Sequence, residues 1–531
     1  MKIMGCIDRK KIIKILILIC VMQLVLALFW AEKKSYLFMD ELFSYASANR
    51  VEGVEAELPA NQWLDELWLL DYVTADAEHT FEYAIPYGNQ ATDVHPPLFY
   101  LFLHTACSMI PEQFSYWAGT GCNIIFFIAS TIALYFLAKE LLKDNVGALL
   151  AAFLYSISYG GLNTMAFIRM YMLLTLIVIL HTYVYLKYFE QESIPLKGYI
   201  YLGITVVLGM LTQYYFAIIA FFYGVWYAVT FLCKKQYQKL IKYISTAAVS
   251  AACSLAIYPT MWKHIFSTSR GVEARENFVS SEGYLQKLLT MWRLMDSQLF
   301  TNLFLAVAVV LIVLAVLVWK KGDKAFDRAF TFKIGAMFSA CLLYFMVVTK
   351  IAPYQIDRYV MPIYPLVYLM VIGAMYLLLK KIVCENKAVV LCVLGFGGLS
   401  IVHMLYSNIP HTYSEDIIIT PRLEIAEEYQ DHYAVYIGKR EKDIPKYYDI
   451  LQVLSKYRGY YYIDGTTDIS KNKEDIEILK NESSVVVYVD DNIKTKEVFE
   501  LFLNLFEGKS TAKDNVIHRD EGWIVYLVDI E

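Results

Sequence analysis

The chain has 531 residues, of which 58% are hydrophobic and 19% are charged, and its mean hydropathy is +0.43. The hydrophobic fraction and the mean hydropathy are higher than in soluble proteins and the charged fraction is lower, as is typical of proteins that cross a membrane several times. The formal net charge is -5, and the basic residues form no cluster away from the ends of apolar segments, which argues against a nucleic-acid-binding protein.

The first apolar segment follows a basic N-terminus. Four lysines and arginines lie between residues 9 and 14, an apolar run then extends to Trp30, and no small-residue cleavage site follows it. A secretory signal peptide has a shorter apolar run and a cleavage site. The pattern therefore predicts an uncleaved first transmembrane helix in the cell membrane, with a cytoplasmic N-terminus.

Apolar stretches of about 20 residues are long enough to cross a bilayer as helices. The chain has about eleven of them, near residues 11–30, 115–138, 145–165, 169–188, 197–213, 214–232, 241–260, 301–319, 332–349, 359–379 and 388–405. A shorter apolar segment, 96–110, begins with a Pro-Pro pair. If this segment does not cross, the lysines beside the spans fall on the side of the basic N-terminus. The positive-inside rule thus predicts a juxtamembrane or re-entrant helix there.

This topology makes residues 31–114 a long first external loop. The loop is strongly acidic between residues 52 and 82. Apolar residues such as Val54, Trp63 and Leu64 recur between the acids, and their spacing predicts an amphipathic helix over about 54–68, lying on the membrane surface.

The composition changes near residue 406, where dispersed charges and short β-type runs replace the long apolar stretches. Strands are predicted at 433–437, 485–489 and 523–528, and helices near 421–430 and 496–506. We therefore expect two domains. Residues 1–405 form a transmembrane catalytic domain with the loop 31–114, and residues 406–531 form a small α/β domain on the extracytoplasmic side.

Two adjacent acids, Asp40 and Glu41, follow the first span by roughly two to three helical turns, at or near the outer membrane surface. A carboxylate in a partly desolvated position acquires a raised pKa and can serve as a general base. Solvated loop acids that cap a helix would give the same pattern. Both interpretations stay open at this point.

The stretch Asp93-Val94-His95-Pro96-Pro97-Leu98-Phe99-Tyr100 is more specific. A Pro-Pro pair fixes the backbone where an irregular segment enters a helix, so Asp93 and His95 should be held rigidly at its N-terminus. A simple helix cap at Asp93 is the structural alternative.

Taken together, Asp40-Glu41 after the first span and DVHPPL at the end of the long first loop resemble the protein O-mannosyltransferases and their bacterial relatives, including the aminoarabinose transferases that decorate lipid A. Two further segments agree with this resemblance. The stretch 169–174 (RMYMLL) is similar to the Arg-x-Tyr-x-Leu stretch of the bacterial members, and 357–362 (DRYVMP) is similar to their Arg-Tyr-x-x-Pro segment.

The resemblance implies a fold of the GT-C class, a sugar donor carried on a polyprenyl phosphate, and chemistry on the non-cytoplasmic face. It implies that Asp40 is the catalytic base, and it makes Glu41 and Asp93 the other candidate catalytic residues. The acceptor could be a protein, a lipid or a cell-wall polymer. Gln213 stands where many bacterial members have His, which leaves the acceptor open.

Such a reaction needs a cation against the departing phosphate and a surface for the sugar. Arg358 and Arg169 are candidates for the first task, although arginines at span ends also anchor helices at the interface. Stacking candidates for the sugar are Tyr171, Tyr214 and Tyr359. Each of these tyrosines could equally be a membrane-interface residue.

His95 is a further candidate substrate contact, with a structural hydrogen-bonding role as its alternative. No cysteine and histidine spacing suggests a metal site. A divalent metal stays open as a cofactor, because one or two carboxylates do not define a site.

The sequence thus favours an inverting glycosyltransferase that moves one sugar from a polyprenyl-phosphate donor to an acceptor at the extracytoplasmic face. A transporter or flippase of lipid-linked sugars is an alternative, but it predicts paired repeats with interrupted helices, which are not visible. A surface-polysaccharide ligase or polymerase is a third reading, but its site would more naturally lie in a late external loop.

Overall fold

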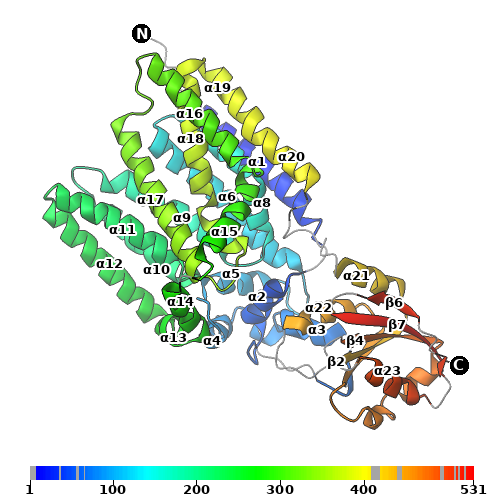
Figure 1. Cartoon of the computed structure of the whole chain (residues 1–531). Coiled ribbons are helices and arrows are strands. Elements are labelled where there is room, and N and C mark those ends of the chain that lie inside the picture. Colours follow the sequence, from blue (N-terminus) through cyan, green and yellow to red (C-terminus); the bar gives the residue numbers. More distant parts are fainter. Residues whose placement is uncertain are drawn as a thin grey trace. The chain divides into compact units, whose positions relative to one another are not determined.

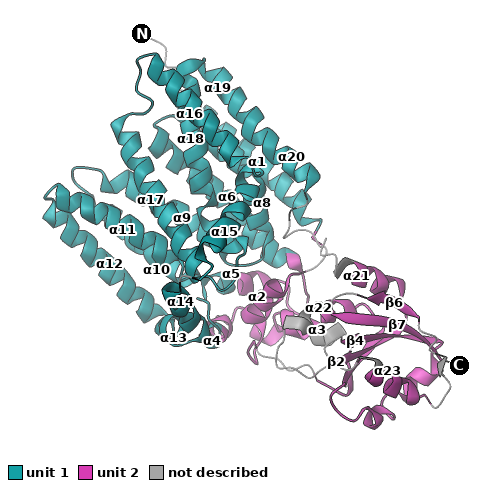
Figure 2. Ribbon diagram, in the orientation of Figure 1, with its two compact units in different colours: residues 1–33, 90–102, 117–412 teal, residues 34–89, 103–116, 413–531 magenta. Residues whose placement is uncertain are grey.

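The computed structural model describes residues 8–34, 37–54, 59–64, 66–280, 282–407, 409, 419–438, 445–490, 495–506, 510–511, 515–519 and 522–530. Its contacts divide the chain into two compact units, shown in Figure 2. The helical unit comprises residues 1–33, 90–102 and 117–412. The mixed unit comprises residues 34–89, 103–116 and 413–531.

Long apolar helices build the helical unit (Figure 1). They are α1 (Arg9–Ala31), α6 (Tyr116–Leu142), α7 (Asn145–Ser156), α8 (Tyr159–Ala166), α9 (Tyr171–Val184), α10 (Leu196–Thr212), α11 (Phe216–Cys233), α12 (Tyr237–Ile257), α15 (Tyr284–Phe300), α16 (Phe304–Lys320), α17 (Arg328–Ile351), α18 (Tyr364–Ile382), α19 (Glu385–Cys392) and α20 (Gly398–Tyr406). Shorter elements connect them: α13 (Met261–Phe266), α14 (Ser269–Val279), the 3-10 turns η3 (Asp357–Tyr359) and η4 (Met361–Ile363), and the π-helical segments η2 (Tyr185–Phe189) and η5 (Val393–Gly397).

Within the described residues, eight helices are long and apolar enough to cross a membrane. Two bent pairs, α7 with α8 at 52° and α15 with α16 at 68°, raise the number to ten. The one predicted span outside these ten is 197–213. It corresponds to α10, which has only 17 residues. The protein is therefore a multi-pass membrane protein, as the length of its apolar stretches predicted.

The segment around the Pro-Pro pair forms α5 (Leu98–Cys107), and α4 (Ala84–Thr92) precedes it. Helix α5 has ten residues. At about 1.5 Å per residue it is too short to cross a hydrocarbon core of about 30 Å. This agrees with the prediction that 96–110 does not span the membrane.

A seven-stranded sheet forms the centre of the mixed unit, in the order β1-β3-β2-β4-β7-β5, with β6 also paired to β7. The strands are β1 (Gln62–Leu64), β2 (Tyr433–Gly438), β3 (Gly459–Asp464), β4 (Ser484–Asp490), β5 (Ser510–Thr511), β6 (Val516–Arg519) and β7 (Trp523–Ile530). Strands β3, β2 and β4 are parallel, whereas β7 runs antiparallel to β4. The predicted strands at 433–437, 485–489 and 523–528 are confirmed.

The helices of the mixed unit are α2 (Met39–Asn49), α3 (Glu66–Val73), α21 (Ile419–Glu428), α22 (Pro445–Leu454) and α23 (Thr495–Asn504), with 3-10 turns η1 (Ala77–His79), η6 (Ile469–Asn472) and η7 (Glu477–Asn481). Helix α23 packs against one face of the sheet, where Phe499 and Phe502 join the core formed by Val435, Val487 and other inward-facing residues. The helices predicted near 421–430 and 496–506 are α21 and α23.

The first external loop is part of the mixed unit, because β1 extends the C-terminal sheet. Gln62, Trp63 and Leu64 pair antiparallel with Tyr462, Tyr461 and Tyr460 of β3. The prediction of an amphipathic helix over 54–68 is therefore wrong at 62–64, while residues 55–58 and 65 lie outside the described residues. The Trp63 ring packs against the rings of Tyr433 and Tyr461, so it joins the core on one face of the sheet. The division by contacts also differs from the sequence-based boundary at 405/406, since the loop goes with the C-terminal region.

Candidate functional site

The Pro96-Pro97 pair defines the first part of the site. Both prolines are buried, and α5 begins directly after them at Leu98. Proline disfavours helical backbone in the preceding residue, so Asp93 and His95 lie in the turn that leads into α5. There the Nδ1 atom of His95 lies 2.7 Å from Oδ2 of Asp93.

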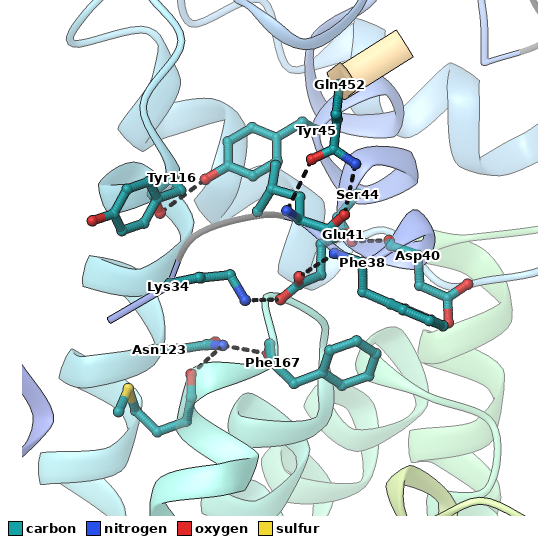
Figure 3. Close-up of polar contacts among 12 residues, drawn as sticks. Lys34, Phe38, Asp40, Glu41, Ser44, Tyr45, Tyr116, Asn123, Phe167 and Gln452 are labelled. Carbon is teal, nitrogen blue, oxygen red and sulfur yellow. Dashed lines mark hydrogen bonds and ion pairs between the residues drawn. The ribbon is translucent and has the colours of Figure 1, made fainter. Parts of the chain in front are cut away.

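Arg169 lies against this turn from a different part of the chain. It is buried, in the connection between α8 and α9, and its Nη2 atom is 3.5 Å from Nε2 of His95. The connection is held by Asn123 of α6, whose side-chain amide donates to the carbonyl oxygens of Met165 at 3.0 Å and Phe167 at 2.6 Å (Figure 3). A buried asparagine in an apolar helix therefore fixes the position of Arg169.

The hydrogen-bond pattern assigns the protonation of this cluster. An ionised carboxylate only accepts hydrogen bonds, so Nδ1 of His95 carries the proton that is donated to Asp93. Burial alone would raise the pKa of Asp93. The interactions with His95 and Arg169 and the backbone N–H of Val94 outweigh burial, however, and lower the pKa of Asp93 to about 2. Asp93 is therefore an ionised carboxylate at neutral pH.

A second histidine, His264 of α13, also faces this region. Its Nδ1 atom is 2.8 Å from the hydroxyl of Tyr214, and its Nε2 atom is 3.5 Å from the carbonyl oxygen of Ala91. Burial lowers the pKa of His264, although Ala91 and Asp93 act in the opposite direction. The hydrogen bond between His264 and Tyr214 shows that this tyrosine hydroxyl is oriented by a protein partner.

The late segment 357–359 forms a second polar turn in the helical unit. Asp357 accepts a hydrogen bond from the Asn163 amide at 3.0 Å, and the guanidinium of Arg358 lies 5.4 Å from the ring centre of Tyr359. The Tyr359 ring packs edge-on against Tyr215 at 5.7 Å. Asn163 also donates to Gln298, so α8 and α15 both support this turn.

Tyr171 is the first residue of α9 and follows Arg169 by two positions, and its ring stacks on Phe167 with 5.8 Å between the ring centres. All predicted site residues other than Asp40 and Glu41 belong to the helical unit. The structure brings Asp93, His95 and Arg169 together through direct contacts. Tyr214 contacts His264, and Arg358 lies beside Tyr359 in the second turn.

Asp40 and Glu41 begin α2 in the mixed unit, and their surroundings differ sharply. Glu41 is buried, accepts the Lys34 ammonium group at 2.9 Å and accepts the N–H of Phe38 at 2.8 Å. It thereby closes the N-terminus of the helix and neutralises a buried cation. Asp40 is half-buried, and its carboxylate points away from the Lys34–Glu41 pair (Figure 3).

Different tasks for the two acids follow from these contacts. Both oxygens of Glu41 are held by protein donors, whereas the carboxylate of Asp40 is directed elsewhere. A catalytic role for either acid stays a prediction. Within the described part of the chain, no group of three or more His, Cys, Asp or Glu side chains is placed to hold a metal ion.

Comparison with known proteins identifies the sequence segment that contains much of this cluster. Residues 94–260 match the family model of dolichyl-phosphate-mannose-protein mannosyltransferases. The match includes His95, Arg169, Tyr171 and Tyr214, and it ends before Arg358. No curated protein sequence was found to be similar to the chain.

Solved structures extend the comparison to the whole fold. ArnT from Cupriavidus metallidurans, bound to undecaprenyl phosphate, has 10% sequence identity and a TM-score of 0.50, with 96% of this chain and 97% of that chain covered. The apo state of the same protein has 12% identity, a TM-score of 0.45 and coverages of 91% and 95%. The oligosaccharyltransferase AglB from Archaeoglobus fulgidus, in complex with an inhibitory peptide and a dolichol-phosphate, has 12% identity, a TM-score of 0.42 and coverages of 91% and 70%.

The first of these structures shows that the chain has the GT-C fold, which its motifs predicted. The resemblance to mannosyltransferase-like GT-C glycosyltransferases is confirmed in sequence over residues 94–260.

Proposed function

We propose that the protein is an inverting glycosyltransferase that moves one sugar from a polyprenyl-phosphate donor to an acceptor hydroxyl. In this reaction the acceptor oxygen forms a bond to the anomeric carbon, and the bond from that carbon to the lipid phosphate breaks. The acceptor proton goes to a general base, and the negative charge goes to the departing phosphate.

The observation that carries the proposal is the Asp93–His95–Arg169 cluster, in which His95 and Arg169 belong to the matched segment and Asp93 directly precedes it. A buried arginine is costly in a membrane protein and is kept there for a task. Arg169 has five donors in a planar fork, which suits a phosphate. Asp93 and His95 hold one edge of that fork and keep it oriented when the site is empty, and Arg358 supplies a second positive charge for the same phosphate.

Asp40 is the proposed base. Its carboxylate is half-buried at the start of α2, outside the Lys34–Glu41 pair. Glu41 is proposed to hold the first turn of α2 rather than to take the proton, because both of its oxygens already accept protein hydrogens. Asp93 is proposed to position Arg169 and the α5 entrance.

Aromatic rings supply the sugar-binding surface in this proposal. Tyr171 and Tyr359 lie near the arginines, and Tyr214 is oriented by His264. The polyprenyl chain would lie against apolar helix faces. The N-terminus is proposed to be cytoplasmic and the C-terminal region extracytoplasmic, so transfer occurs on the outer side. The acceptor is proposed to be a protein, a lipid or a cell-wall polymer.

The test is identification of the donor, followed by its turnover. Lipid mass spectrometry of the purified protein should find a co-purified polyprenyl-phosphate monosaccharide. Arg169→Met should lose this lipid, whereas Arg293→Met, which changes an exposed arginine on α15, should retain it. Vesicles in which the wild-type protein moves the lipid-linked sugar across the bilayer without cleaving it would identify a transporter instead. Transfer of a whole oligosaccharide would identify a ligase or polymerase.

A further inference from the structure

Gln452, a side chain of α22, holds the backbone of the first external loop. The amide of Gln452 makes two hydrogen bonds to the backbone of Leu37: the Leu37 N–H donates to Oε1 at 3.0 Å, and Nε2 donates to the Leu37 carbonyl at 2.9 Å (Figure 3). A side-chain amide carries both a donor and an acceptor, so it can satisfy the N–H and the carbonyl oxygen of one residue together. Both residues belong to the mixed unit.

The position of Leu37 gives this contact its importance. Leu37 is buried and immediately precedes Phe38, the N-cap residue of α2. Phe38 is in turn tied to Glu41 by its backbone N–H. Gln452 therefore fixes the backbone three residues before Asp40, and the cap carries this constraint into the first turn of the helix.

A second attachment joins the same loop to the same region. Strand β1 pairs with β3, and the indole N–H of Trp63 donates to the carbonyl oxygen of Asp475 at 2.8 Å. The N–H of Asn61 donates to the Tyr462 carbonyl at 2.7 Å. The loop is thus attached to the C-terminal region both before and after α2, so the helix cannot shift as a free segment.

We propose that Gln452 is a positioning residue for Asp40, and that the C-terminal region is part of the transfer machinery because it holds α2 in place. The proposal rests on the proposed function, in which Asp40 is the base. A displacement of about 1 Å of a catalytic group can lower a rate by as much as about 100-fold. Loss of the Gln452 bonds should therefore act on the chemical step, although Gln452 itself touches no reacting atom.

The test compares two variants in the purified full-length protein. Gln452→Met keeps the side-chain length and removes both hydrogen bonds. We expect kcat to fall roughly 10- to 100-fold while KM for the donor changes less than about twofold, since donor binding does not involve α2 in the proposed mechanism. Lys456→Gln, an exposed change four residues further along the chain, is the matched control and should have wild-type kinetics.

Amide hydrogen exchange gives an independent readout. In Gln452→Met, the amides at the start of α2 should exchange faster, while those of β2 and β4 should not change. If this variant is not monodisperse, Gln452→Asn replaces it, because a side chain shorter by one methylene cannot reach both Leu37 atoms. Unchanged kcat, or an equal loss in the Lys456→Gln control, overturns the positioning role.

The outcomes separate this inference from the proposed function. If Asp40→Asn transfers sugar at the wild-type rate, the proposed base is wrong whatever Gln452 does. If Asp40→Asn is inactive and Gln452→Met is fully active, only the positioning role fails. A rise in KM at unchanged kcat also contradicts the proposal, since it would place Gln452 in substrate binding.

Discussion

Loss of charge should destabilise α2 strongly at Glu41 and hardly at all at Asp40. Glu41→Gln removes the negative charge 2.9 Å from the Lys34 ammonium group, where the side chains are 1% and 3% exposed. At this distance the Coulomb attraction is about 6 kcal/mol at an effective dielectric constant of about 20. Much of it offsets the desolvation of the two ions. Removing one partner leaves the other charge buried, which costs roughly 3–5 kcal/mol.

Amide hydrogen exchange of α2 measures this loss directly, because the helix can open locally. A cost of about 3 kcal/mol corresponds to exchange faster by a factor on the order of 100. Lys34→Met combined with Glu41→Gln should restore most of the protection, since no unpaired charge remains. Asp40→Asn should leave exchange nearly unchanged. Equal acceleration by Asp40→Asn and Glu41→Gln, or no recovery in the double variant, would refute the division of roles.

Three further predictions concern the charge, the grouping and the orientation of the site. The pKa of Asp93 lies near 2, below its ordinary value of 3.8, so its stabilising effect is present above about pH 4 and is lost as the pH falls toward 2. The melting-temperature difference between wild type and Asp93→Asn should then be constant from about pH 8 to 5 and shrink below about pH 4; a difference that already varies between pH 8 and 5 contradicts this. If Asp40 and Asp93 serve one reaction, the fold-loss of activity in the double Asn variant should be smaller than the product of the two single fold-losses. A double-variant loss equal to that product refutes the placement of both acids in one site. In a chain without native cysteines, a cysteine at Glu78 or Lys456 should react with an impermeant reagent from outside and one at Lys324 should not, and protection of Lys456 would reverse the proposed orientation.

The helical unit was the part of the fold most open to prediction from sequence. Apolar runs of about 20 residues have few folded alternatives, because every backbone polar group must be satisfied within the bilayer. The bends were not predictable. The chain turns by 52° between α7 and α8 and by 68° between α15 and α16. These angles depend on packing against other helices, such as the contacts of Gly160 with α15 and α18, and hydropathy does not record such contacts.

The pairing of β1 with β3 was missed for a different reason. The short run at 62–64 has an ordinary amphipathic appearance, and its partner strand lies almost 400 residues later. Only the tertiary pairing shows that Trp63 packs against the core of the sheet. The strand β3 was itself missed, although its tyrosine-rich run 460–462 has strong β-propensity.

For the site, the sequence motifs identified several candidate residues, but they did not identify the polar residues that hold those candidates in place. The His-Pro-Pro motif pointed to Asp93 and His95, and Arg169 followed from its short motif. Asn123, His264 and Gln452 gave no comparable signal, because single polar residues in apolar or helical segments occur for many reasons. A buried asparagine within an apolar span such as α6 was the one available indication, since such residues usually hold another backbone or side chain in place.

Turnover of a defined polyprenyl-phosphate hexose by purified wild type and Asp40→Asn tests the central claim most directly. The wild-type protein should release polyprenyl phosphate and form a product with inverted anomeric configuration. Asp40→Asn should bind the donor with wild-type affinity but lose a factor of roughly 10²–10⁴ in turnover, as expected for removal of a general base. Wild-type turnover by Asp40→Asn, or a product with retained configuration, would contradict the account.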